Sequence, residues 1–464
     1  MERVLNQTVA PPALKDISGY VMVKMRESRY AWTHPGSSSV VCEGVTRATA
    51  HPEGKVVLGV TGGWLAIMAP AVVTLALRLR EFNASGVPAT YALILALGWL
   101  TMILALIVSG SWGDTAQRRF STRRSQARIA VPLIAAGGVL LAIAPSPAWL
   151  ATAWVAVQIP SAIIITTALA DGGRTVAPDR RGLTSGMVGA APIMALLFGG
   201  IAVRVLGDSL TWAFVIPALV GALVAAPLMH AGAPSGLSPE ANEDQAISQW
   251  PSKRSRTSLW MAFLVGSFLL ACSTSTTNGF LVTFVQYVTA VSPDEISDLS
   301  SLAVIIAAIL AAAASVTAGA LTDGKAVSIR LWILACALCS VALAALLAAP
   351  TATTVLIAAS VFGIAFGAAN GVEFTVVLLV RRERERLGRD FGLFTALTSA
   401  PYVLVPIVAA ALLSERPAEA MVRLFALACV TAAMGALVVS TVVIRQSRRV
   451  RPVAEFAEPA ISIN

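Results

Sequence analysis

Long apolar runs separated by short polar loops fill most of the chain. A run of about 20 apolar residues is long enough for a helix to cross a lipid bilayer. Many of the loops are only a few residues long, so the helices on either side must be antiparallel neighbours. The pattern predicts an all-α membrane protein with twelve transmembrane helices, at 56–77, 88–109, 127–145, 148–169, 184–205, 210–229, 258–281, 297–321, 327–349, 352–380, 391–413 and 420–444.

The longest internal polar segment, 230–257, divides these helices into two groups of six. It is rich in proline, serine and charge, a composition typical of a linker. We therefore predict an N-terminal six-helix bundle at 56–229 and a C-terminal six-helix bundle at 258–444. Residues 1–55 and 445–464 are expected to form polar tails.

The composition excludes a soluble protein. The chain of 464 residues is 56% hydrophobic and only 13% charged, whereas soluble domains are about 45–50% apolar and about 25% charged. The formal net charge is +9. Its arginines fall in short clusters between apolar runs, which is typical of membrane topology and not of a nucleic-acid site. We expect a lipid bilayer around the protein and no nucleic acid as a partner.

The basic residues are concentrated in alternate loops. Cytoplasmic loops of membrane proteins carry an excess of lysine and arginine. The basic loops and both termini are therefore expected in the cytoplasm, in a multi-pass protein of the plasma (inner) membrane. The residues concerned are Arg118, Arg119, Arg123, Arg124 and Arg128; Arg174, Arg180 and Arg181; Lys253, Arg254 and Arg256; Lys325 and Arg330; and Arg381, Arg382, Arg384, Arg386 and Arg389.

Two of these loops share a motif. "GSWGDTAQRRFSTRR" at 110–124 and "GALTDGKAVSIR" at 319–330 both contain G-x-x-x-D followed by basic residues. The glycine lets two helix ends approach closely, and the aspartate can bind a neighbouring helix end or an arginine. We expect a cytoplasmic gate built from Gly110, Asp114, Arg119, Arg123, Gly319 and Asp323.

With this repeated motif, the chain resembles the major facilitator superfamily, whose signature is G-x-x-x-D-R-x-G-R-R. Thr115 stands where the family usually has arginine, and Ser121 where it often has glycine. The resemblance covers about 56–444 and implies two six-helix bundles that rock about a solute site between them. "APDRRGLTSGMVGAAP" and "GRDFGLFTALTSAPYVLVPIVAA" are similar to motifs of the sugar- and glycoside-type cation symporters.

Ionisable residues inside the predicted helices are few, and each is a candidate functional group because a charge in the membrane is costly. Glu373, in the helix at 352–380, is the clearest. Apolar surroundings favour a neutral carboxyl group, which can bind a proton in one conformation and release it in another. Glu373 either couples transport to protons, or it reaches water or pairs with Arg381, about 12 Å along the helix.

Asp171 is the second candidate for proton coupling. It precedes Pro178, at the end of the fourth predicted helix, by about the same spacing as Glu373 precedes Arg381. The fourth and tenth helices occupy matching places in the two halves, so each half carries one acid at a similar depth. A structural pair of Asp171 with Arg174 or another loop arginine is the alternative.

Uncharged polar residues in the predicted helices are candidates for lining a solute cavity. Asn370 lies one turn from Glu373 on the same helix face. Pro401 and Pro406 flank Tyr402 and are expected to break their helix and expose its carbonyl groups. Amides and phenols suit hydroxyl-bearing solutes, although they are also common at helix contacts. The candidates are Asn370, Gln158, Asn278, Gln286 and Tyr402.

The sequence lacks motifs for enzyme, metal or cofactor chemistry. It has no G-x-x-x-x-G-K-[ST] loop, metal-ligand cluster or catalytic triad. The three histidines, His34, His51 and His230, lie in the predicted tail and linker. Cys336 and Cys339 form a C-x-x-C inside an apolar helix, without a partner pair. We expect neither an enzyme nor a cofactor.

These observations lead to three hypotheses. The first is a monomeric secondary active transporter that moves a small polar organic solute by alternating access, with proton coupling. The second is a proton-driven exporter of drugs or metabolites. The third, of another class, is a membrane scaffold or sensor on the same fold, which a dry, fully packed interface between the halves would favour.

Overall fold

The computed structural model describes residues 52–82, 87–120, 124–206, 209–230, 253–289, 291–322, 327–381, 386–412 and 417–454. All of the described residues belong to one compact unit, 51–464. Every regular element in the described residues is helical.

The first half, 52–230, begins with a helix that is interrupted once. Pro70, which lacks a backbone N–H, starts a short π-helical segment between two α-helical pieces. The Tyr91 hydroxyl donates to the Ala71 carbonyl in this segment at 2.5 Å. The elements are α3 (Pro52–Ala69), η1 (Pro70–Thr74), α4 (Leu75–Glu81), α5 (Val87–Phe120), α6 (Arg124–Ala142), α7 (Pro147–Thr175), η2 (Pro178–Arg180), α8 (Arg181–Leu206), α9 (Leu210–Ala225) and η3 (Ala226–His230).

The second half, 253–454, contains a helix that is broken near its middle. The break falls at Ala400, immediately before Pro401, whereas Pro406 lies inside a continuous helix. The Pro401 carbonyl accepts a hydrogen bond from Ser275 Oγ at 3.2 Å. The elements are α11 (Lys253–Val288), α12 (Pro293–Thr322), α13 (Val327–Ala348), α14 (Ala352–Val380), α15 (Leu387–Ser399), α16 (Pro401–Leu412) and α17 (Pro417–Ala454).

The helices confirm the predicted all-α membrane fold. Eleven stretches of the described residues are long and apolar enough to cross a membrane, and they coincide with all the predicted helices except the first. The first, predicted at 56–77, is the helix divided into α3, η1 and α4.

Some of the segments predicted as polar are helical. α11 begins at Lys253, inside the predicted linker 230–257, and α17 continues to Ala454, inside the predicted tail 445–464. Gln446 Nε2 donates to the Ser255 carbonyl at 2.8 Å and so joins these two helix ends. Hydropathy marks the part of a helix inside the bilayer, so it misses turns that continue beyond it.

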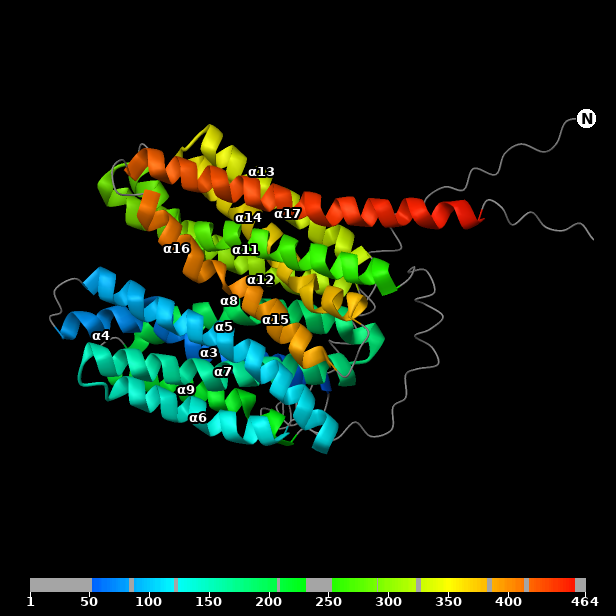
Figure 1. Cartoon of the computed structure of the whole chain (residues 1–464). Helices are drawn as coiled ribbons and strands as arrows, with labels where there is room; N and C mark the ends of the chain where they lie inside the picture. The colour runs from blue at the N-terminus through cyan, green and yellow to red at the C-terminus, as the bar shows by residue number, and fades with distance from the viewer. Residues whose placement is uncertain are drawn as a thin grey trace, which may run out of the picture. The chain divides into compact units, whose positions relative to one another are not determined.

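Figure 1 shows how the helices pack. In the first half, α3 contacts α7, α8 and α9, and in the second half α11 contacts α17 and α14 contacts α12 and α13. The halves meet along two seams, where α5 contacts α15 and where α8 contacts α12 and α14. Small residues line the second seam: a Cβ on Gly189 of α8 would collide with the Asn370 carbonyl of α14. Close approach of this kind is typical of helix contacts in membranes.

Candidate functional site

Among the described residues, the hydrogen bonds between the halves gather toward one end of the helix bundle. We call it the basic end. Here α5, α7, α12 and α14 end, and α8, α11, α13 and α15 begin. The opposite end is called the far end. The basic end corresponds to the loops whose arginines predict a cytoplasmic location.

Asp114 joins the two halves at the basic end. Its Oδ1 accepts from the backbone N–H of Gly388 at 3.0 Å, and its Oδ2 accepts from that of Arg389 at 2.8 Å. Both N–H groups belong to the first turn of α15, where helix N–H groups have no partner within the helix and favour an anion. Arg174 of α7 adds an ion pair, with Nη2 3.5 Å from Asp114 Oδ1. The carboxylate of one half thus caps a helix of the other.

Glycines bring the same helices together. A Cβ on Gly110 would collide with the Gly388 carbonyl, and one on Gly392 would collide with the Leu106 carbonyl. On the second seam, a Cβ on Gly319 would collide with the Gly182 carbonyl. Gly110, Gly319 and Asp114 of the predicted gate therefore all lie at contacts between the halves. Arg119 is exposed near the end of α5, while Arg123 and Asp323 lie outside the described residues.

Hydrogen bonds also cross the second seam. Ser315 Oγ of α12 donates to the Gly186 carbonyl of α8 at 2.8 Å. The backbone N–H of Thr375 donates to Ser185 Oγ at 3.2 Å, and its hydroxyl donates to the Arg181 carbonyl at 3.2 Å. Arg181 is the first residue of α8, so this seam, like the first, is closed toward the basic end.

Arg381 and Asp390 form a buried ion pair beside the first seam. The guanidinium donates through Nε to Oδ2 at 2.7 Å and through Nη2 to Oδ1 at 3.1 Å. Asp390 is only 2% exposed, and the Arg381 guanidinium carbon lies 5.4 Å from the centroid of the Trp260 ring. Two parallel hydrogen bonds of this type fix both position and orientation. The pair ties the end of α14 to the first turn of α15.

Glu373 lies deeper, about two helical turns from the end of α14. Trp332 Nε1 donates to Glu373 Oε1 at 3.5 Å, and Trp332 itself is fully buried in α13. Glu373 is partly exposed. Among the ion pairs between described residues, Arg381 pairs with Asp390 and not with Glu373. The carboxyl group is therefore placed by an indole N–H and not by the arginine that follows it.

The remaining candidates of the first half lie on α7. Asp171 is partly buried, one turn before Arg174. Gln158 is completely buried, and neither atom of its amide makes a hydrogen bond. Trp154, one turn away, has a buried Nε1–H without a hydrogen-bond acceptor. An unsatisfied buried amide of this kind costs free energy, so Gln158 is a position where a polar ligand group would be stabilising.

The remaining candidates of the second half lie on three helices. Asn370 is partly buried, and its Nδ2 donates within α14 to the Phe366 carbonyl at 2.9 Å. Tyr402 of α16 stacks on Trp99 of α5, with ring centroids 5.0 Å apart and an angle of 18° between the ring planes. Asn278 and Thr274 of α11 lie near the Tyr402 hydroxyl. This group therefore also connects the two halves.

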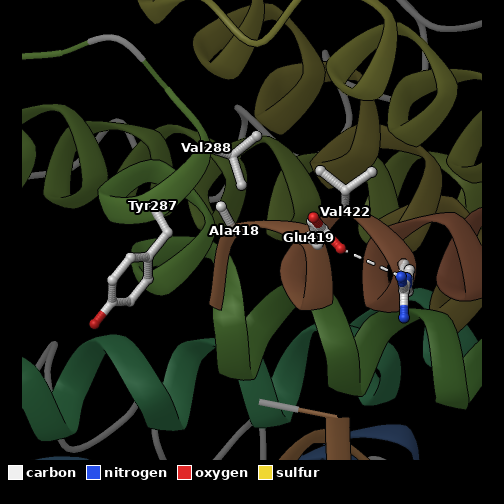
Figure 2. Close-up of a pocket in the computed structure, with 6 residues that line it drawn as sticks. Tyr287, Val288, Ala418, Glu419 and Val422 are labelled. Atoms are coloured by element: carbon white, nitrogen blue, oxygen red, sulfur yellow. Dashed lines mark hydrogen bonds and ion pairs between the residues drawn. The ribbon is translucent and has the colours of Figure 1, made fainter. Parts of the chain in front are cut away.

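A hollow of about 400 Å³ lies at the far end, between α11 and α17. Figure 2 shows Tyr287 on one side and Glu419 on the other. Glu419 forms an ion pair with Arg423 at 3.3 Å. Gln286 is exposed beside Tyr287. The residues that line the hollow belong to the second half alone.

Sequence reasoning did not single out Asp390, Trp260 or Trp332. Asp390 lies in the segment "GRDFG". The signal that could have pointed to it is an acidic residue in the first turn of a helix. The two tryptophans gave no signal, because an aromatic residue in an apolar helix is usually a packing residue. Their roles depend on the neighbouring helices.

The two six-helix halves, closed against each other at one end by a carboxylate and glycines, define a membrane transporter of the two-bundle class. Residues 56–385 match the family model of the Major Facilitator Superfamily, and the chain belongs to this family. It is therefore a membrane transport protein and not an enzyme.

Solved transporters share the fold at low sequence identity. The human organic anion transporter MFSD10 (TETRAN) is 15% identical, with a TM-score of 0.63, over 84% of this chain and 99% of that chain. A bacterial homologue of the iron transporter ferroportin, in an outward-facing state, is 13% identical, with a TM-score of 0.62 over 84% and 99%. The proton:xylose symporter XylE is 14% identical, with a TM-score of 0.62 over 85% and 96%. No curated protein sequence matches the chain.

Proposed function

We propose that the protein is a proton-coupled secondary transporter of a small polar organic solute, with Glu373 as the coupling residue. The basic end faces the cytoplasm of a plasma (inner) membrane protein, in keeping with the arginine-rich loops. The solute site lies between the halves, where transporters of this construction bind their substrates.

The observation that carries the proposal is the environment of Glu373. It is an acidic residue within a membrane helix, partly exposed and contacted by an indole N–H. Its nearest basic residue along α14, Arg381, is engaged by Asp390. Among the described residues no cation pairs with Glu373, and a carboxyl group in such apolar surroundings is favoured as the neutral acid and becomes an anion when water reaches it. A conformational change that alters its access to water therefore changes its protonation.

Alternating access supplies that conformational change. In this structure both seams between the halves are closed toward the basic end, through Asp114 with α15 and through Ser315 with α8. The solute and the proton then enter from the far end. Breaking these contacts while the far end closes reverses the access of the central site.

Flux measurements in proteoliposomes test the proposal. A thermal-shift screen of sugars, glycosides and cationic drugs on the purified protein first identifies a solute that binds, because a ligand of the folded state raises its apparent stability. Uptake of that solute is then measured with and without an imposed pH gradient. We expect Glu373→Gln to lose acceleration by the gradient and to keep solute exchange at equal concentrations.

Glu419→Gln is the matched control, because Glu419 is an exposed glutamate at the far end. It should retain gradient-driven uptake. Gradient-driven uptake of normal rate in Glu373→Gln would remove Glu373 from the mechanism. A solute that moves at the same rate with and without a gradient in the unmodified protein would remove proton coupling altogether.

A further inference from the structure

Arg381 lies between Glu373 and the basic end of the second half. Eight residues of α14 separate the two, or about 12 Å at about 1.5 Å per residue. Val377 and Val380 follow Glu373 at helical spacings on the same face, and both are buried. The face of α14 that joins the two charged residues is therefore apolar and buried.

Aromatic rings from three other helices pack at the level of Glu373. Phe263 of α11 lies edge-on against Trp332 of α13, with ring centroids 5.3 Å apart. It also stacks on Phe394 of α15 at 5.4 Å. All three rings are buried. They contain no group that both accepts and donates a proton at neutral pH, so they do not offer a route from Glu373 toward the basic end.

The ion pair of Arg381 and Asp390 forms the next layer toward the basic end. Asp390 precedes Phe394 by one turn of α15, and Trp260, which the guanidinium faces, precedes Phe263 by about one turn of α11. The same order therefore holds on α11, α14 and α15. Glu373 and the aromatic rings come first, and the cation with its carboxylate partner lies closer to the surface.

We propose that Arg381, held by Asp390 and Trp260, is the gate that prevents proton exchange between Glu373 and the basic end in this conformation. The proposal rests on the proposed coupling role of Glu373. The guanidinium stays protonated and cannot accept a further proton, so it does not relay a proton between Glu373 and the basic end, and two hydrogen bonds to Asp390 hold it in place. Arg381 acts by closing the way to Glu373 and contacts neither the transported proton nor the solute.

The charged and titratable groups around both residues agree with this assignment. Cys336 of α13 and Tyr402 of α16 lie close enough to interact electrostatically with Glu373. Asp390 interacts with Arg381 and Arg389, and also with Asp114 of α5. The cationic groups gather at the ion-pair layer, while the groups near Glu373 are neutral in their common forms.

The gate is connected to the contact between the halves. Asp114 binds the backbone N–H groups of Gly388 and Arg389, and Asp390 is the next residue of the same turn. When the halves separate at the basic end, the first turn of α15 loses Asp114 and is free to move with Asp390. Arg381 then loses its position, water reaches Glu373, and the carboxyl group gives its proton to that water. Opening of the halves and release of the proton thus occur in one step.

Proton leak through protein without solute tests this gate. Proteoliposomes that contain a pH-sensitive dye are given a pH gradient, and the rate of its decay is measured. We expect Arg381→Gln to raise the leak severalfold, because water then reaches Glu373 from the basic end. Asp390→Asn should raise it as well, because Arg381 is no longer held.

The deciding variant is the double substitution with Glu373→Gln. If the leak of Arg381→Gln passes through Glu373, Arg381→Gln with Glu373→Gln should leak at the rate of unmodified protein. A leak that persists in the double variant, or an absence of leak in both Arg381→Gln and Asp390→Asn, would overturn the gate. Arg423→Gln, which removes an exposed arginine from the far end, is the control and should not leak.

The leak assay contains no solute, so it is separate from the test of the proposed function. Gradient-driven uptake in Glu373→Gln alone decides whether that residue couples transport. If coupling fails there and the Arg381→Gln leak still requires Glu373, only the proposed function falls. If coupling holds and the leak does not require Glu373, only the gate falls.

Discussion

The Asp114 carboxylate accepts a hydrogen bond from the backbone N–H of Gly388, although 274 residues separate the two in the sequence. The contact is made to the backbone of a helix terminus, so it requires α15 to begin at that position and does not depend on a side chain there. Because Asp114 and Gly388 belong to different halves, the contact exists only while the basic end is closed. In the proposed alternating-access cycle this contact is therefore lost when the basic end opens.

Asp114→Asn should therefore favour the state that is open at the basic end. An amide accepts through one oxygen only and carries no charge, while hydrogen bonds to charged groups contribute about 1.5–3 kcal/mol each. Losing one of them shifts the equilibrium between states by about tenfold or more. The measurement is the distance between spin labels on α5 and α15 at the basic end, which should lengthen. Asp179→Asn, an exposed aspartate at the same end, should leave the distance distribution unchanged.

Gly319→Val should also prevent closure of the basic end, in this case because of a steric clash. A Cβ at this position would collide with the Gly182 carbonyl and with the Gly186 backbone. Backbone atoms cannot move aside as a flexible side chain does, so α8 and α12 must separate. We expect transport to fall at least tenfold, while the labelling of a cysteine introduced at the basic end increases. Gly279→Val is the control, because nothing lies within 4 Å of a Cβ there. Equal loss of transport in both variants would show that closure at Gly319 is not the cause.

The sequence was sufficient to predict the helices because one rule, the apolar length needed to cross a bilayer, determines them. α14 begins and ends at Ala352 and Val380 as predicted. The termini of α11 and α17 were not predictable, because their outermost turns depend on the contact between Gln446 and Ser255. Such a contact between distant segments leaves no trace in local hydropathy.

The candidate site was predictable only in its residue types. An acid in an apolar helix identified Glu373, and the repeated motif identified Asp114 and the two glycines. The sequence could not reveal that Arg381 pairs with Asp390 and not with Glu373. The three residues lie close together in the sequence, so Arg381 could pair with either carboxylate. The position of α15 decides that it meets Asp390. The partners of Trp332 and Trp260 likewise depend on helix packing.

Trp99 and Tyr402 should stabilise contact between the halves independently of the basic end. Their stacked rings come from α5 and α16, and an aromatic pair contributes about 0.5–1.5 kcal/mol beyond its buried area. In a double-mutant cycle with Trp99→Leu and Tyr402→Leu, the thermal stabilities should show a coupling free energy of that size. Trp99→Leu with Phe425→Leu is the matched control cycle, because the Phe425 ring packs elsewhere, against Phe284. Additive effects in the first cycle would show that the stack does not contribute.

Gln158→Leu should make the protein more stable. The side chain is fully buried and both amide atoms lack hydrogen bonds, so replacing the amide by an apolar group of similar size removes a desolvation cost of about 1–3 kcal/mol. The melting temperature in detergent should rise. If Gln158 also contacts the solute, the same variant should bind it more weakly, because the polar group that recognises the solute is gone. Gln286→Leu, an exposed glutamine on α11, should change neither quantity. A lower melting temperature in Gln158→Leu would mean that the amide is satisfied in the membrane, and would argue against a role for it in binding.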